Sequence, residues 1–156
     1  MDEIIEEAST SSRATSEPTH AFLMGIPRHS TRSPTGRGGK GYVAYDLDHN
    51  RCAFLKDYWY TVDDSVHPET EVYQRLRAHQ VRFVASLVAG GDVGQPPAFQ
   101  ETLTQDHLPI EGRPAKRRHH RFVVEEIGRP LETYRSDRQL LRTVSRALIG
   151  KLINSS

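Results

Sequence analysis

The sequence has little of several features that would narrow its class directly. Cys52 is the one cysteine among 156 residues, which excludes a disulfide framework and a cysteine-rich metal site. No apolar run approaches the roughly 18 residues that a membrane span needs, and the N-terminus lacks the apolar core of a signal peptide. Its 21 Lys and Arg against 20 Asp and Glu leave a net charge of +1, which excludes a nucleic-acid binder held by overall positive charge. We therefore expect an intracellular protein with neither a membrane nor a nucleic-acid partner.

The N-terminal segment differs in composition from the rest of the chain. Its first twenty residues hold five acidic side chains and one arginine among many Ser and Thr, with few large apolar residues. Such a composition cannot bury enough apolar surface to offset the entropy of ordering. We expect a flexible tail over residues 1–28 and a single folded unit over residues 29–156.

The remaining chain alternates between strand and helix patterns. The apolar and β-branched spacing predicts strands over 42–47, 52–55, 81–90 and 122–128, and helices over 68–79 and 136–150. The turn Asp48-His49-Asn50 joins the first two strands into a hairpin, and residues 92–112 read as a loop. This order predicts an α+β fold in which an antiparallel sheet carries one packed helix, followed by a C-terminal helix.

The C-terminal helix has a recognisable start. Ser136 and Gln139 fit a capping box, in which the serine hydroxyl and the Gln side chain each bind a free backbone N–H. A buried face is expected from residues on one side of this helix, namely Leu140, Val144, Ala147 and Leu148.

One segment, RPAKRRHHR at 113–121, is strongly basic, with five Lys and Arg and no acid. Contact with nucleic acid or a localisation signal is one interpretation, but the near-neutral chain favours a solvated basic loop before a strand. His119 and His120 are adjacent, so in a strand they would point to opposite faces. This argues against a metal that both would share.

Three glycines form a phosphate-loop pattern. Gly36, Gly38 and Gly41 give G-x-G-x-x-G, and Val43 extends it to G-x-G-x-x-G-x-V. Such glycines allow the backbone to approach phosphate closely with its N–H groups facing the ligand. A strand rather than a helix follows Gly41, which excludes a dinucleotide-binding fold and leaves a kinase-type loop between two strands. A glycine-rich surface turn without a ligand is the alternative.

A lysine and a carboxylate follow the loop. Lys56 ends the second strand of the hairpin, where a kinase needs a lysine to reach the nucleotide phosphates. Glu69 is the preferred partner because the apolar face of the 68–79 helix follows it at helical spacing, and Glu71 is the alternative. The plainer alternatives are a solvated lysine and a first-turn glutamate that favours the helix dipole by about 0.3–1 kcal/mol.

Several segments together resemble the fungal-type protein kinases. The likeness covers about residues 30–150, and it is carried by four segments: SPTGRGGKGYVAYDLDHNRCAFLKDYW (33–59), PETEVYQRLRAHQV (68–81), LVAGGDV (87–93) and RHHRFVVEEIGRPLETYRSDRQLLRTVSRAL (118–148). The resemblance implies a protein-kinase-like small lobe, with the C-terminal helix from the start of the large lobe. It also implies that a fixed set of residues binds or positions ATP: Gly36, Gly38, Gly41, Val43, Lys56 and Glu69.

The sequence departs from this family after the last helix. Kinases continue into a His-Arg-Asp loop and an Asp-Phe-Gly metal ligand, whereas this chain ends in KLINSS and holds neither. Residues 29–156 are therefore expected to be a partial kinase domain, truncated before the catalytic loop. The family transfers phosphate from ATP to Ser or Thr, but we expect this chain alone to be inactive and not to hold Mg²⁺. The alternative is a non-catalytic, kinase-derived module that binds a protein partner through exposed lobe surface.

Overall fold

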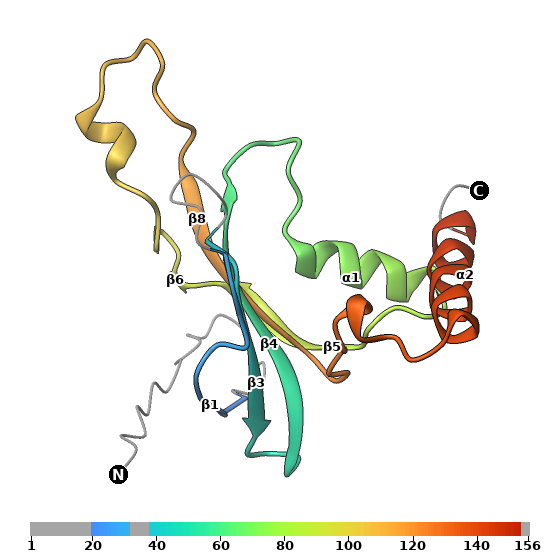
Figure 1. The fold of residues 1–156 in the computed structure, drawn as a ribbon. Helices are drawn as coiled ribbons and strands as arrows, with labels where there is room; N and C mark the ends of the chain where they lie inside the picture. Colours follow the sequence, from blue (N-terminus) through green and yellow to red (C-terminus); the bar gives the residue numbers. More distant parts are fainter. Residues whose placement is uncertain (1–19, 32–37, 154–156) are drawn as a thin grey trace.

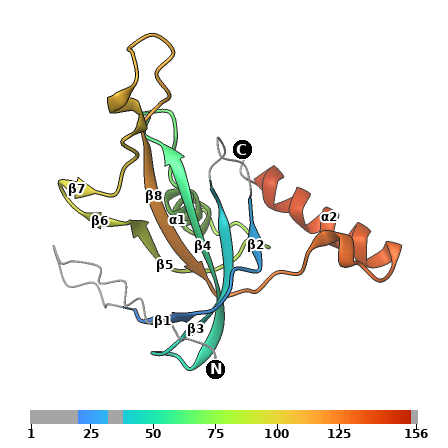
Figure 2. The ribbon, with the colours of Figure 1, turned by 60° about the vertical axis from the view of Figure 1, so that its left-hand side comes forward.

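The computed structural model describes residues 20–31 and 38–153. Among these residues, six strands form one antiparallel sheet in the order β1-β3-β4-β8-β5, with β2 also paired to β3 (Figures 1 and 2). The strands of this sheet are β1 (Phe22–Met24), β2 (His29–Ser30), β3 (Lys40–Asp46), β4 (Arg51–Thr61), β5 (Leu87–Asp92) and β8 (Arg117–Val124). The other elements are α1 (Glu69–Ala78), β6 (Gly94–Gln95), β7 (Ala98–Phe99), η1 (Thr104–His107), η2 (Leu131–Thr133) and α2 (Asp137–Ile153). The α+β class with an antiparallel sheet and two α-helices is confirmed.

The β3–β4 hairpin is the centre of the fold. The turn forms where predicted, because the Asp46 carboxylate accepts the backbone N–H groups of Asp48 and His49 and Asn50 adopts a left-handed conformation. Strand β4 is longer than predicted and continues to Thr61. Pairing with β3 on one side and β8 on the other extends it, since each partner supplies a ladder of backbone hydrogen bonds.

Apolar side chains are buried on both faces of the sheet. One cluster contains Ala44, Ala53, Leu55 and Val123, and strand β1 packs against it through Phe22 and Met24. The other cluster contains Tyr58, Tyr60, Phe122 and Val124, and helix α1 covers it through Tyr73. Lys56 belongs to the second face, because side chains alternate along β4. The alternation therefore sends Lys56 toward the helix.

Strand β1 corrects the predicted N-terminal boundary. Phe22–Met24 lies within the expected tail of residues 1–28, but it pairs with β3 in the register Phe22↔Asp46 to Met24↔Ala44. A run of three residues is too short to predict a strand from its apolar pattern. Phe22–Met24 forms a strand because the edge of β3 provides backbone hydrogen-bond partners. Residues 1–19 of the expected tail lie outside the described residues.

Two other predicted segments are also corrected. The strand expected over 81–90 is β5, and its paired residues run from Leu87 to Asp92. Gly90 and Gly91 therefore lie inside the strand. Only residues 113–116 of the basic segment form the expected loop: β8 begins at Arg117, earlier than the expected strand of 122–128, and ends at Val124. Its charged side chains find acidic partners on neighbouring strands, which local sequence does not reveal.

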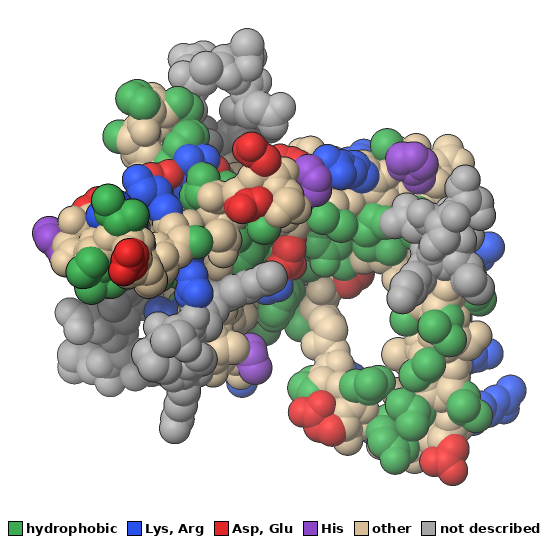
Figure 3. All heavy atoms as spheres, turned by 90° about the horizontal axis from the view of Figure 1, so that it is seen from above, with side chains coloured by type: hydrophobic (Ala, Val, Ile, Leu, Met, Phe, Trp, Pro, Cys, Tyr) green, Lys and Arg blue, Asp and Glu red, His purple; other side chains and the backbone are tan. Residues whose placement is uncertain are grey.

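Helix α2 begins as predicted but packs differently. Gln139 donates its backbone N–H to the Ser136 hydroxyl, and its side-chain oxygen accepts the N–H of Arg135. Of the expected buried face, however, Leu140 is half-buried and the other three residues are exposed, with Leu148 at 55%. The helix stands beside the sheet instead of on it (Figure 2), and apolar side chains remain visible on that part of the surface (Figure 3).

Neither α-helix has the length and hydrophobicity needed to cross a lipid bilayer, within the part of the chain that the structure describes.

Candidate functional site

The candidate site is a lysine–glutamate pair between the sheet and α1. Lys56 Nζ lies 2.5 Å from Glu69 Oε1. The lysine comes from the middle of β4, and the glutamate is the first residue of α1. Both side chains are partly exposed, at 36% and 30%, so the pair lies at the rim of the core and solutes can reach it.

Contacts at the helix N-terminus hold Glu69 in place. Its backbone N–H, which has no partner within the helix, donates to the hydroxyl of Tyr58 on β4 at 2.9 Å. The next residue, Thr70, is buried and its hydroxyl lies 3.1 Å from Nε2 of His120 on β8. Two successive residues of α1 are therefore fixed to two strands, which aims the Glu69 carboxylate at Lys56.

The Lys56 ammonium has capacity beyond this ion pair. It lies 5.1 Å from the ring centre of Tyr58 and 5.7 Å from that of Phe122, within the range of cation–π attraction. An ammonium carries three N–H donors, and Glu69 accepts one. Since the side chain is about one-third exposed, the other donors are available to an anionic ligand.

The structure brings two of the predicted loop residues onto the same face. Gly41 lies opposite Lys56 in the β3–β4 register, and Val43 lies opposite Phe54; residues directly opposite share a face of the sheet. A Cβ at Gly41 would meet the Phe54 ring at 2.7 Å, so no larger residue fits there without displacing that ring.

The two other glycines of the pattern, Gly36 and Gly38, precede β3 in the sequence. Gly38 has φ +56°, a left-handed conformation that glycine adopts at no steric cost. Gly36 lies outside the described residues. Of the six residues predicted to bind or position ATP, the structure therefore describes all but Gly36, and Gly41, Val43 and Lys56 share one face of the sheet.

The second acidic candidate lies elsewhere. Glu71 pairs with His67 at 3.1 Å and with Arg75 at 3.7 Å, on the exposed side of α1. Successive residues of an α-helix are rotated by about 100° around its axis, so the side chains of Glu69 and Glu71 project about 200° apart. Of the two carboxylates that the sequence left open, Glu69 is the one beside Lys56.

Two buried histidine–aspartate pairs were missed by sequence reasoning. On the face away from α1, His119 Nε2 lies 2.7 Å from Asp57 Oδ1, and Arg121 binds the other oxygen at 2.6 Å. On the α1 face, His120 Nδ1 lies 2.7 Å from Asp92 Oδ1. The predicted opposite directions of the two histidines are confirmed. The sequence predicts that the two histidines alternate along the strand, but it does not reveal their acidic partners, which come from β4 and β5.

The electrostatics of these carboxylates follow from their partners. Burial opposes ionisation of Asp57, but hydrogen bonds from His119 and Arg121 outweigh it and lower its pKa. Burial likewise opposes ionisation of Asp92, and bonds from His120, Arg118 and Tyr60 outweigh it and lower its pKa. Both carboxylates are therefore charged at neutral pH, and each offsets the charge of one arginine of β8: Asp57 that of Arg121 and Asp92 that of Arg118.

The Asp92–His120–Thr70 chain has the order of a nucleophilic triad. Its hydroxyl is nevertheless inaccessible, because Thr70 is 6% exposed and His120 is 2% exposed. A nucleophile must reach a substrate carbonyl or phosphorus at about 3 Å. The chain therefore fastens α1 to the sheet and does not form a catalytic centre.

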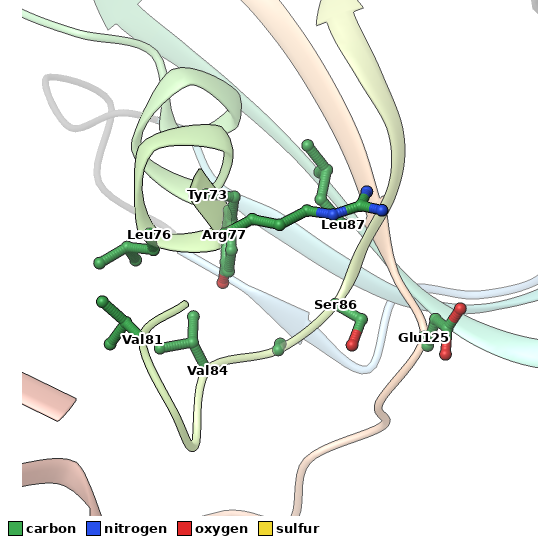
Figure 4. Close-up of a pocket in the computed structure, with 9 residues that line it drawn as sticks. Tyr73, Leu76, Arg77, Val81, Val84, Ser86, Leu87 and Glu125 are labelled. Carbon is green, nitrogen blue, oxygen red and sulfur yellow. The ribbon is translucent and has the colours of Figure 1, made fainter. Parts of the chain in front are cut away.

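A pocket of about 350 Å³ lies at the other end of α1 (Figure 4). Its lining combines Tyr73 and Arg77 of α1 with Val81, Val84 and Leu87 from the segment that follows the helix. Lys56 and Glu69 do not line it, so this pocket is separate from the candidate site.

No family model, curated protein or solved structure matches this chain significantly.

Proposed function

We propose that this chain is an ATP-binding lobe of the protein-kinase type, related to the fungal-type protein kinases. The observation that carries the proposal is the ion pair between Lys56 in a sheet strand and Glu69 at the start of the packed helix. In a kinase a strand lysine held by a helix glutamate meets the nucleotide phosphates. The sequence resemblance, whose segments include both residues, and the pair support the same assignment.

The residues present fit a nucleotide at this face. Lys56 supplies a positive charge with donors to spare, and the Gly36, Gly38 and Gly41 loop would cover the phosphates. At Gly41 the Phe54 ring would lie 2.7 Å from a Cβ, so glycine at this position lets β3 pack closely against that ring. Val43, on the same face, would give apolar contact to the base. ATP supplies the phosphoryl group; the chain's own residues bind and orient it.

Phosphate transfer is not proposed for these 156 residues alone. They contain no His-Arg-Asp or Asp-Phe-Gly sequence, so no aspartate is assigned to accept a substrate proton or to hold Mg²⁺. The proposal is therefore nucleotide binding, with no chemical step on this chain by itself.

Titration with a fluorescent ATP analogue tests the proposal. We expect saturable binding that Lys56→Met weakens by about 10–100-fold, because a charge-assisted hydrogen bond contributes about 1.5–3 kcal/mol. Lys116→Met is the matched control, since Lys116 also pairs with a glutamate, Glu101, at 3.2 Å. Equal loss in both variants, or no saturable binding by the wild type, contradicts the proposal. Labelled-phosphate turnover that Lys56→Met abolishes would contradict the expected inactivity.

The second candidate is a non-catalytic module that binds a protein partner. It is favoured by the exposed apolar residues of α2, including Leu141 at 69%. Absence of nucleotide binding in the titration above, together with association through α2, would support this candidate over the first.

A further inference from the structure

A second group of ligating side chains lies at the β3–β4 turn, at the opposite end of the hairpin from Gly41. It contains His20, Asp46 and His49, each of which offers one ligand atom, and these atoms all lie within 4.8 Å of one another. His49 Nδ1 lies 2.8 Å from Asp46 Oδ2. The two imidazole rings are stacked with centres 5.8 Å apart.

Two of these side chains are unusual for a protein surface. Asp46 is fully buried, at 0% exposure. Its Oδ1 accepts the backbone N–H groups of Asp48 and His49, and its Oδ2 faces His49 Nδ1 at 2.8 Å and Arg51 Nε at 3.9 Å, as the burial of a carboxylate requires. His20 Nδ1 is buried and has no hydrogen-bond partner. Its nearest acid is Asp48, whose Oδ2 lies 3.5 Å away. This buried ring nitrogen has no hydrogen-bond partner and lies near the carboxylates of Asp46 and Asp48. A cation bound between these groups would supply its missing partner.

The fold rather than local sequence assembles this group. The β1–β3 pairing places Phe22 opposite Asp46, so His20 reaches the turn from 26 residues upstream. Leu47 donates its N–H to the Ala21 carbonyl at 3.0 Å, and Ala21 donates its own to Asp48 Oδ2 at 3.3 Å. The backbone near His20 is therefore fixed against the turn.

We propose that His20, Asp46 and His49 bind a divalent transition metal, Zn²⁺ in the first instance, with Asp48 as the fourth ligand. Two imidazoles and two carboxylates suit Zn²⁺, whereas Ca²⁺ and Mg²⁺ take oxygen ligands alone. Ligand atoms around one tetrahedral Zn²⁺ lie about 3–4 Å apart, so the three side chains within 4.8 Å of one another would move closer by about 1 Å, and the Asp48 carboxylate would turn from the Ala21 N–H toward the metal.

Bound metal would fasten β1 to the central hairpin. His20 precedes β1, while the other three ligands belong to the end of β3 and the turn. Binding to the folded chain alone raises its stability by mass action. This function is independent of the proposed nucleotide site, because no ligand is shared between the two.

Spectroscopic titration of the full chain with Co²⁺, followed by Zn²⁺ competition, tests the proposal. Tetrahedral coordination by imidazole and carboxylate is expected to give visible absorption at one Co²⁺ per chain, which Zn²⁺ abolishes. His20→Ala and His49→Ala are each expected to weaken binding by about 100-fold or more, as loss of a ligand exceeds the 10–100-fold effect of an outer-shell partner. His107→Ala, an exposed histidine outside the cluster, should bind like the wild type.

The outcomes separate the site from general histidine binding. Circular dichroism of each variant checks that it folds, and Asp48→Asn provides a second variant that keeps both histidines. A Zn²⁺-dependent rise in melting temperature that His20→Ala removes supports the proposal. No 1:1 absorption, or equal binding by wild type and both histidine variants, overturns it.

Discussion

At the residue scale, the sheet is held by carboxylates that each accept from a histidine and an arginine. Asp57 binds His119 and Arg121, and its side chain is 12% exposed. Removing one member of such a group leaves the others buried without a partner, which costs more than the net value of the bonds. These groups make β8, the most basic segment, a central strand.

Asp57→Asn is expected to lower the free energy of unfolding by about 2 kcal/mol at pH 7, since hydrogen bonds to a charged group contribute about 1.5–3 kcal/mol. Because the pKa of Asp57 is lowered in the folded chain, its ionised form stabilises the fold above the unfolded value near 4. That stabilisation is lost as the pH falls through the lower, folded pKa. Urea unfolding of the wild type and the variant from pH 7 to pH 3 measures the loss of stability at pH 7 and its dependence on pH.

The matched control is Asp64→Asn, at an exposed position between β4 and α1. It should leave the unfolding free energy within about 0.5 kcal/mol of the wild type at every pH. If the unfolding free energies of the wild type and Asp57→Asn differ by the same amount at every pH down to 3, ionisation of Asp57 does not stabilise the fold.

At the element scale, the position of α1 decides whether Lys56 meets a carboxylate. Strand β5 approaches the helix at Gly90, where a Cβ would lie 2.6 Å from Thr70 Cγ2 and 2.5 Å from Phe122 Cβ. The missing side chain lets the buried Thr70 reach the sheet. The adjacent glycine, Gly91, has open space where its Cβ would be.

Gly90→Ala is therefore expected to destabilise the chain by about 1–3 kcal/mol, the usual cost of overpacking. It should also weaken binding of the ATP analogue, because the displaced helix carries Glu69 away from Lys56. Gly91→Ala is expected to be neutral or to stabilise by up to about 1 kcal/mol, as alanine loses less entropy than glycine in a strand. Urea unfolding of both variants measures the difference; equal effects would refute close α1–β5 packing.

At the scale of the whole molecule, α2 contributes little to the core. Its apolar residues include Leu141 and Leu148, which are exposed at 69% and 55%. The Arg146 guanidinium of this helix lies 5.2 Å from the ring centre of Phe83, in the segment between α1 and β5. Exposed apolar surface of this kind favours association with another surface.

Leu141→Gln/Leu148→Gln is expected to change the free energy of unfolding by less than about 0.5 kcal/mol per site, since surface substitutions rarely do more. Gln keeps the helix propensity close to that of Leu. Sedimentation velocity over a concentration series should show self-association of the wild type and less of the variant. The matched control, Arg138→Gln/Arg142→Gln, removes charge and should not reduce association. A loss of several kcal/mol in the leucine variant would place these side chains in the core.

Local pattern was enough for much of the fold and part of the site. The hairpin, the α1 helix and the start of α2 follow from strand alternation, a turn sequence and a capping box, which act between residues close in the chain. Helical spacing alone also favoured Glu69 over Glu71. In each case the deciding interaction spans fewer than about ten residues.

The tertiary structure alone decided the features that depend on distant partners. Strand β1 and the basic strand β8 exist because neighbouring strands supply hydrogen bonds and carboxylates. The grouping of His20 with the hairpin turn has the same origin. The exposure of α2 was hidden because an amphipathic pattern says which face is apolar, and only the positions of the other elements determine whether anything covers it.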